Sequence, residues 1–274
     1  MKISVVIPTI GSRDLKNTLD SIVKSSIEVN EIIISLPPGC IINKDLFINY
    51  NNLKLHYSKF KGQAIQRIEG FKIAENDLVV QLDDDIVLEK KCLELMAVFL
   101  EKNNQSCIAA HFYNIDNGKS IYENQNNIKQ RVLNFFKNGI NTSIYGEITK
   151  SGFESYPNLS ELKSPFKSGW IPGGCVMHFK KNLVLKNYFP FKGKAYSEDL
   201  FHSIELKKKN IELFYHPDAI AYLKVVNEKF SYKDFKKFIS DDIRIRKKIV
   251  HDNNLNPIRM QLVYIIKCLR YIFS

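Results

Sequence analysis

Three consecutive aspartates, Asp83 to Asp85, directly follow VVQL (79–82), a run that is typical of a buried strand. Adjacent like charges repel, and removing even one carboxylate from water is costly. A divalent cation would relieve the repulsion, because carboxylate oxygens are preferred ligands of Mg²⁺ and Mn²⁺. An exposed acidic turn before a helix is the alternative, since the first turn of a helix favours negative charge. The triplet by itself leaves both interpretations open.

A second pair of carboxylates, Glu198 and Asp199, lies in SEDL, just before residues that are typical of a helix. A carboxylate held near a substrate hydroxyl can act as a general base. Ser197 followed by two acidic residues is also a favourable helix N-terminus, so the pair has a structural explanation as well.

The elements around these motifs alternate between strands and helices. The expected order is strand 3–7, a helix with apolar positions from Leu15 to Val23, strands 31–35 and 53–57, a helix over 63–74, and strand 77–82. Such alternation predicts an α/β protein whose mostly parallel sheet is covered on both faces. In these sheets ligands bind outside the carboxyl ends of the strands. The aspartate triplet lies at one such end.

The composition indicates a globular chain of 274 residues with 45% hydrophobic content, enough for a large core. No uncharged apolar run reaches 18 residues and the N-terminus lacks a signal-peptide pattern, so we expect a cytoplasmic protein without a membrane span. Five cysteines without a CxxC pair suit a reducing compartment and predict small core residues, with no zinc site. The Asn-rich stretch 123–130 is predicted to be a loop tip.

The net charge is +11, and residues 224–274 hold twelve Lys and Arg against five Asp and Glu. Such a tail favours an anionic partner, either nucleic acid or a membrane surface. We expect no nucleic acid, because no basic motif with interleaved aromatic residues is present. The apolar segment 257–274 predicts an interfacial helix that turns Arg259, Lys267 and Arg270 toward anionic headgroups. Packing on the domain or a dimer contact is the alternative.

Five motifs in order carry a resemblance to a known family. They are VVIPT (5–9), KGQAIQRIEGFKIA (61–74), VVQLDDDI (79–86), WIPGGCVMHFKK (170–181) and SEDL (197–200). Over about residues 3–222 the chain resembles the family 2 glycosyltransferases of the GT-A fold. The resemblance implies a Rossmann-like fold with a mixed, mostly parallel central sheet, followed here by a helical C-terminal extension. It also implies an enzyme that transfers a sugar, with inversion, from a nucleotide diphosphate donor to an acceptor hydroxyl.

The resemblance assigns the triplet to the family's DxD motif, in which carboxylates hold Mn²⁺ or Mg²⁺ at the donor diphosphate. Asp83 and Asp85 match the outer positions, and Asp85 is favoured as the metal ligand. Some family members align one residue differently, which makes Asp84 the alternative ligand. The cation would stabilise the charge that develops on the leaving nucleotide diphosphate. The residues implied in donor binding are Pro8, Thr9, Arg13, Arg67, Asp83 and Asp84.

On the acceptor side, Asp199 matches the family's general base and Glu198 is the alternative base. Gly173 and Gly174 let backbone approach a ligand without a Cβ in the way, and Trp170 is a candidate to stack on a sugar ring. A turn after Pro172 and a core position for Trp170 are the competing explanations.

Two departures from the family pattern keep a second function open. EIIISLPPGC (31–40) lacks the acid that reads uracil in many members, and Leu223 stands where many members have a metal-binding His. His216 lies just upstream and is not expected to substitute. The alternative is therefore a degenerate GT-A protein that binds nucleotide or glycan without turnover.

The expected organisation is a GT-A domain over 1–225, with a nucleotide-sugar half (1–105) and an acceptor half (106–225), and a basic helical extension over 226–274. The predicted role is assembly of a surface polysaccharide or of a lipid-linked glycan. Its partners would be a nucleotide-sugar donor, a glycan or lipid-linked glycan acceptor, and an anionic membrane surface on the inner face of the plasma membrane that contacts 257–274.

Overall fold

A computed structural model describes residues 1–42, 48–122, 128–140, 145–157, 162–192, 195–225 and 231–273. The chain divides into two compact units, one formed by residues 1–121 with 159–225 and the other by 122–158 with 226–274. The predicted boundary near 225 coincides with the end of the first unit. Residues 122–158, which the sequence analysis assigned to the acceptor half, group instead with the C-terminal helices.

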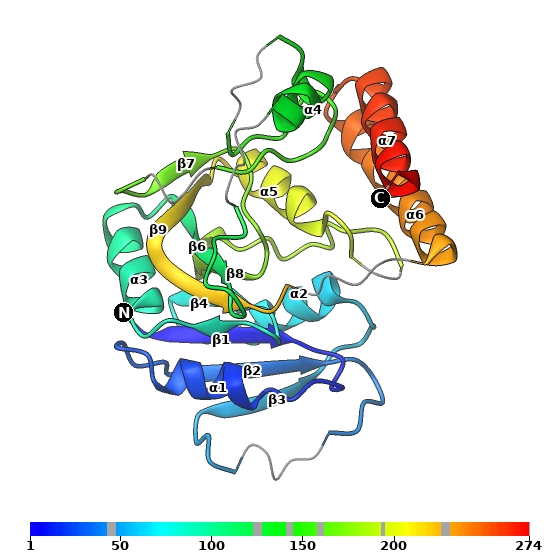
Figure 1. Cartoon of the computed structure of the whole chain (residues 1–274). Coiled ribbons are helices and arrows are strands. Elements are labelled where there is room, and N and C mark those ends of the chain that lie inside the picture. The colour runs from blue at the N-terminus through cyan, green and yellow to red at the C-terminus, as the bar shows by residue number, and fades with distance from the viewer. Residues whose placement is uncertain are drawn as a thin grey trace. The chain divides into compact units, whose positions relative to one another are not determined.

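A mixed sheet forms the first unit (Figure 1). Its strands in spatial order are β3 (Leu53–Tyr57), β2 (Glu31–Leu36), β1 (Ile3–Pro8), β4 (Leu78–Leu82), β8 (Cys175–Phe179), β6 (Ser106–Asn114), β9 (Glu212–Leu223) and β5 (Val87–Leu88), with β7 (Phe166–Ser168) paired to β9. The first four in this order are mutually parallel, whereas β8 runs antiparallel to both neighbours. The predicted strands and the mixed α/β fold are confirmed.

The parallel pairing places several chain segments at one edge of this sheet. β1 pairs in register with β4, so the loop after Pro8 and the triplet after Leu82 leave the sheet side by side. On the other side of β4, Leu82 pairs with Cys175, and the Asp83 amide donates to the Gly174 carbonyl at 2.8 Å. The two glycines therefore run directly beside the triplet.

Four helices belong to the same unit: α1 (Lys16–Val23), α2 (Gln63–Ile73), α3 (Cys92–Lys102) and α5 (Glu198–Lys208). α2 packs on β1 and β2 and begins and ends within a residue of the predicted range. Gly70 makes this close approach possible, because a Cβ at that position would lie 2.4 Å from Cγ1 of Val6. This close packing fixes the distance between α2, with its polar side chains, and the sheet.

The second unit contains α4 (Ile128–Asn138), α6 (Tyr232–Asp252) and α7 (Pro257–Ile272). Its core consists of Phe153, Val250, Met260, Val263 and Tyr264, which are all buried. Both C-terminal helices have side-chain N-caps, since Ser231 accepts from the Asp234 amide and Asn256 from the Arg259 amide. α7 is therefore an integral part of a packed helical unit.

Three further predictions concern membrane spans, cysteines and the Asn-rich stretch. No helix among the described residues has the length and apolar character needed to span a bilayer. All five cysteines are free; Cys92, Cys107 and Cys175 are buried as predicted, whereas Cys40 and Cys268 are half-buried. Most of the predicted loop tip, 123–127, lies outside the described residues, and residues 128–130 begin α4.

Candidate active site

The three aspartates are held by different partners, which explains how three adjacent carboxylates coexist at the end of β4. One oxygen of Asp83 accepts from the Arg67 guanidinium at 2.9 Å and from the Gln63 amide at 3.0 Å. Gln63 and Arg67 lie four residues apart on α2 and therefore share one face of that helix. The helix and the strand end together enclose the first carboxylate.

Asp84 is bound from the loop after β1. It accepts from the hydroxyl of Thr9 at 2.6 Å and from the guanidinium of Arg13 at 2.6 Å. Arg13 also lies 2.7 Å from Asp85, the most exposed of the three aspartates, with a side chain that is 45% accessible. One guanidinium thus neutralises two neighbouring carboxylates in the place where the sequence predicts a cation.

Arg67 connects the triplet to the second acidic motif. Its guanidinium, which is fully buried, contacts Glu198 at 2.5 Å as well as Asp83 at 2.9 Å. The other oxygen of Glu198 accepts from the hydroxyl of Tyr188 at 3.1 Å. A single side chain therefore joins the carboxyl end of β4 to the first turn of α5.

The charges in this cluster shift one another. Burial raises the pKa of Asp83 to about 6 against the opposing effect of Arg67, and the nearby carboxylates of Glu198 and Asp85 add to the rise. Burial works against the charge of Arg67, but Glu198 and Asp83 more than offset it and raise the pKa of Arg67 well above its usual value. The guanidinium is therefore permanently charged inside the protein.

Glu198 and Asp199 occupy different surroundings although they are adjacent. Glu198 is 6% exposed and engaged with Arg67, whereas Asp199 is half-buried in the same first turn of α5. Ser197 precedes them in the left-handed region with φ of 54° and makes no side-chain capping bond. The Ser197 side chain therefore does not cap α5, whereas both acids lie in its first turn, as the structural explanation for SEDL expects.

The paired glycines are explained by close approach to other parts of the site. A Cβ on Gly173 would lie 2.8 Å from Oε1 of Glu198, and a Cβ on Gly174 would lie 3.0 Å from the ring of Phe112. A side chain at Gly173 would therefore collide with Glu198, and one at Gly174 would crowd Phe112.

Trp170 does not have the role that the sequence analysis suggested. The ring is 2% exposed and packs edge-on against Tyr215 at 6.3 Å between centroids. A ring so thoroughly covered has no free face for a sugar, so the competing explanation, a core residue, holds in this structure.

Sequence reasoning missed two members of the cluster, Gln63 and Tyr188. The spacing of Gln63 and Arg67 on one helix face was a usable signal, since α2 itself was predicted. Tyr188 lies outside regular secondary structure and in no recognised motif, so no local pattern pointed to it. Pro8 ends β1, and His216 lies on β9 and accepts from the Asp218 amide through its ring. In the part of the chain that the structure describes, neither forms a hydrogen bond or an ion pair with the triplet.

Among the described residues, no cluster of three or more His, Cys, Asp or Glu side chains is arranged to hold a metal ion. The donor set nevertheless suits Mg²⁺ or Mn²⁺, because these ions commonly take one or two carboxylates and complete their shell with substrate phosphates and water. Asp85, the most accessible of the three carboxylates, fits that requirement, with Asp83 two residues away.

The fold and the acidic cluster define the class as an α/β protein with a GT-A sheet and an acidic site at its strand ends. The family model for glycosyl transferase family 2 matches residues 41–156. The uncharacterized glycosyltransferase MG060 of Mycoplasma genitalium is 29% identical over 126 residues, which are 41% of this chain and 42% of that protein.

Two solved structures share the fold at 17% sequence identity. GalNAc-T7, crystallised with UDP, GalNAc and Mn²⁺, superposes with a TM-score of 0.60 over 83% of this chain and 44% of its own. Residues 1–349 of TarS from S. aureus superpose with a TM-score of 0.55 over 96% of this chain and 69% of theirs. Residues 41–156 are thus similar to glycosyl transferase family 2, and the chain has the GT-A fold. It spans less than half the length of the Mycoplasma relative and of GalNAc-T7.

Proposed function

We propose that this protein is an inverting glycosyltransferase that moves a sugar from a nucleotide diphosphate to an acceptor hydroxyl. The observation that carries the proposal is the Arg67 bridge, which brings the acids after β4 and the acids that begin α5 into one cluster. An inverting transfer needs a group that stabilises the negative charge on the leaving diphosphate. It also needs a carboxylate that takes the proton of the acceptor hydroxyl. The two acidic motifs are suited to those two tasks.

On the donor side, Asp85, with Asp83 as a second ligand, would hold Mn²⁺ or Mg²⁺. When bound, the ion would supply Lewis-acid stabilisation of the leaving diphosphate. Thr9 orients Asp84 by its hydrogen bond, and Arg13 is 55% exposed and close enough to contact a phosphate once it leaves the aspartates. GalNAc-T7 and TarS have each been crystallised with UDP, which supports a nucleotide-sugar donor here.

On the acceptor side, the proposed general base is Asp199. Glu198 is the weaker candidate, because it is already bound by Arg67 and Tyr188 and is covered from solvent. Both of its oxygens already accept hydrogen bonds from side chains of the site, so neither is aimed at an acceptor hydroxyl. Glu198 instead fixes the first turn of α5, and thereby the backbone that carries Asp199.

A second candidate function is a degenerate GT-A protein that binds nucleotide or glycan without turnover. The specific observation in its favour is Arg13, whose guanidinium occupies Asp84 and Asp85 together. Together with Leu223 at the position of a family histidine, this leaves fewer groups for a metal. The two candidates differ in one measurable respect, because only a transferase releases free nucleotide diphosphate.

The test is a screen of nucleotide sugars with and without Mn²⁺ that records the thermal midpoint of unfolding and the release of nucleotide diphosphate. One donor should raise the unfolding midpoint of a transferase in the presence of the ion. The transferase should also hydrolyse that donor slowly and so release nucleotide diphosphate. Stabilisation without release, with acceptor glycans present, would favour the degenerate binder. No stabilisation by any donor would contradict the transferase and a degenerate protein that binds nucleotide. The same thermal assay with acceptor glycans alone tests the degenerate protein that binds glycan.

The proposed biological setting is the assembly of a surface polysaccharide or of a lipid-linked glycan in the cytoplasm. The excess of Lys and Arg over residues 224–274 supports an anionic or lipid-linked acceptor. The donor screen followed by an acceptor screen with the active donor would identify the chemistry.

A further inference from the structure

The outer face of α7 is an uninterrupted apolar stripe. Its members recur every three or four residues and fall within about 80° of one another at 100° per residue. They are Ile258, Leu262, Ile265, Leu269 and Ile272, which are 67, 37, 54, 48 and 69% exposed. None of the charged residues of α7 lies within this stripe. An apolar face that stays exposed on a packed helix indicates a partner outside the unit.

Two of the three basic residues expected to face headgroups are used inside the unit. Arg259 donates to the carbonyls of Phe135 and Phe136 at the end of α4, at 2.9 and 3.3 Å. Lys267 lies over the ring of Phe153, 4.4 Å from its centroid. The sequence prediction is therefore wrong for Arg259 and Lys267, while Arg270 is exposed.

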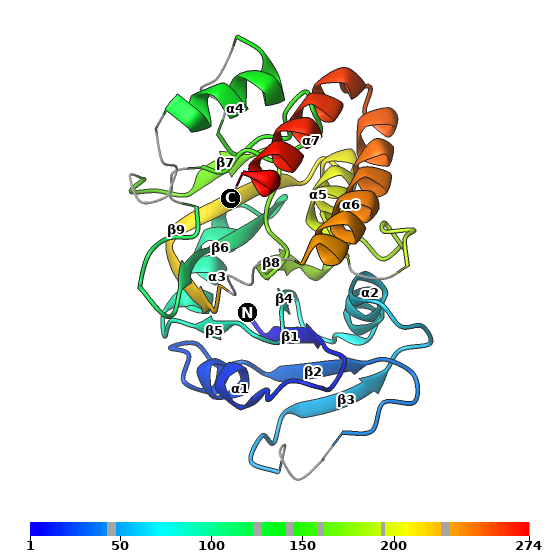
Figure 2. The ribbon, with the colours of Figure 1, turned by 45° about the vertical axis from the view of Figure 1, so that its right-hand side comes forward.

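Other cations gather where the two C-terminal helices meet. Phe235 near the start of α6 stacks on Tyr271 near the end of α7, with centroids 3.8 Å apart, so these ends lie side by side (Figure 2). The exposed cations at this shared end are Lys233, Lys236, Lys237 and Arg270.

Apolar and aromatic side chains are exposed at the same end. Tyr232 is 71% exposed and Phe273 is 83% exposed, next to the last members of the stripe. Aromatic rings with a polar or exposed edge favour the boundary between water and hydrocarbon. The end of the helix pair thus combines lysines, aromatic rings and aliphatic side chains.

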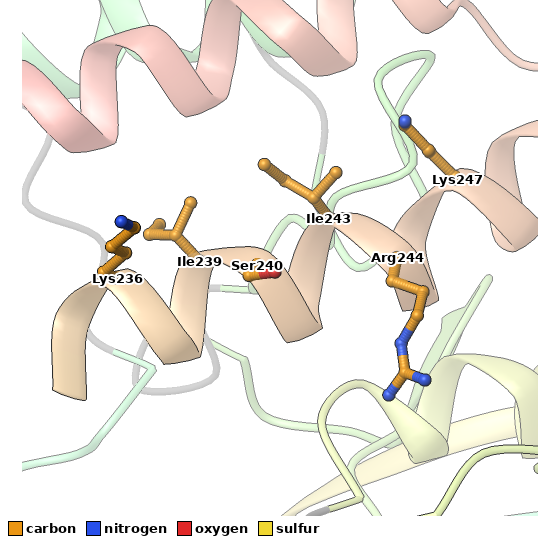
Figure 3. A pocket seen from close by; sticks show the side chains of 6 residues that line it. All are labelled: Lys236, Ile239, Ser240, Ile243, Arg244 and Lys247. Carbon is orange, nitrogen blue, oxygen red and sulfur yellow. The ribbon is translucent and has the colours of Figure 1, made fainter. Parts of the chain in front are cut away.

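The cations continue along α6 on one side of the helix. A pocket of about 500 Å³ is lined by side chains of α6: Lys236, Ile239, Ser240, Ile243, Arg244 and Lys247. Figure 3 shows these six side chains on the helix. The four cations Lys233, Lys236, Lys237 and Lys247 fall within about 100° of one another, and Arg244, which also pairs with Asp241, falls in the same sector. Ile239 and Ile243 pack in part on the core of the unit, so the cations are what this side of α6 offers to a ligand.

We propose that the second unit binds an anionic membrane surface, with the α7 stripe in the interfacial layer and the cations around the shared helix end on lipid headgroups. Interfacial helices combine an apolar face with basic flanks, and their binding strengthens with anionic lipid. A second copy of this chain is the less suitable occupant, because it would bring the same positive charge to the contact. The proposal concerns α6 and α7 and is independent of the reaction in the first unit.

Deleting α7 is not a clean test, because Met260, Val263 and Tyr264 belong to the core of the unit. Point variants of the full chain avoid this problem. Ile265→Asp and Leu269→Asp place a charge on the stripe without touching the core. Val98→Asp, at an equally exposed position (48%) on α3, is the matched control.

A second set of variants tests the charge. Lys233, Lys236 and Lys237 are changed together to Gln, with exposed Lys90, Lys91 and Lys102 changed to Gln as the control. The readout is cosedimentation with vesicles of phosphatidylcholine that contain phosphatidylglycerol, compared with vesicles of phosphatidylcholine alone. Thermal unfolding verifies that each variant is folded.

The full chain should bind the anionic vesicles, and salt should weaken the binding. Each stripe variant should lower the partition coefficient about tenfold or more, as expected for one buried aliphatic side chain. The triple lysine variant should lower it by about fivefold per cation on anionic vesicles and little on neutral ones. Both controls should bind like the unchanged chain.

Unchanged binding of the folded stripe variants would overturn the proposal. So would equal loss in the control variants, which would indicate only a general charge effect. Sedimentation velocity of the full chain without vesicles supplies the last check: a dimer that Ile265→Asp dissociates would assign the stripe to a second copy and also overturn the proposal.

Discussion

The Arg67 guanidinium lies 2.5 Å from Glu198, and both side chains are covered from solvent. The two residues are 131 positions apart in the chain, on α2 and at the start of α5. Because the same guanidinium also contacts Asp83, the pair fixes the distance between the two acidic motifs. It also identifies Arg67 as a structural support of the site; because its side chain is fully buried, it has no exposed surface for the donor contact predicted from the sequence.

Arg67→Met should lower the free energy of unfolding by about 3 to 5 kcal/mol, since it leaves two carboxylates without their buried partner. Arg67→Met combined with Glu198→Gln should cost less than the sum of the single changes, because one uncompensated charge is removed. Urea unfolding of the three variants measures this coupling. Strictly additive effects would mean that the two residues stabilise the protein separately.

Asp85→Asn should lower the transfer rate at least about 10²-fold with the fold intact, because it removes charge at the proposed cation ligand without changing the volume. The side chain is accessible, so the thermal midpoint should move little. Glu101→Gln, an exposed acid at the end of α3, is the matched control. Normal turnover of Asp85→Asn with Mn²⁺ present would show that Asp85 is not a ligand.

Asp199→Asn should lower the transfer rate by about 10² to 10⁴, the usual contribution of a positioned base. Donor affinity should barely change, because the change is on the acceptor side. Calorimetric donor affinity and initial transfer rate, measured together on Asp199→Asn and Glu198→Gln, separate the roles. A near-normal rate for Asp199→Asn beside a collapsed rate for Glu198→Gln would move the base to Glu198, and lost donor affinity would indicate a binding residue.

His178 predicts acid sensitivity of the fold. Neither of its ring nitrogens has a hydrogen-bond partner among the described residues, and burial, followed by the charge of Arg67, lowers its pKa to about 3. A depressed folded-state pKa means that stability is present above the unfolded value of about 6.5 and is lost as the pH falls toward 3. Because of His178, the free energy of unfolding should therefore fall by about 2 kcal/mol between pH 7.5 and pH 5.

His178→Leu should remove that part of the loss, because the ring can no longer take up a proton on unfolding. Urea unfolding at pH 7.5 and pH 5, on the unchanged chain and the variant, measures the difference. The exposed His251 offers a control, since His251→Leu should leave the pH dependence as it is. An identical loss in all three proteins would place the acid sensitivity elsewhere.

The sequence alone determined the elements of the parallel half of the sheet and the fold class. β-branched runs, helical spacing and the order of five motifs are local signals, and for this reason β1, β2, β3, α2 and β4 agree with their predicted ranges. The position of the triplet at a strand end follows from the same local pattern.

Only the tertiary structure decided how the charges are paired. That Arg67 turns to Glu198, that Arg13 neutralises Asp84 and Asp85, and that Trp170 is buried depend on contacts between segments far apart in sequence. The same holds for the tail, where the sequence showed a basic apolar helix but not that Lys267 is used inside the unit. A periodic sequence pattern indicates which face of a helix or strand is apolar. Which segment packs against that face depends on many residues far apart in the chain, so no single position predicts it.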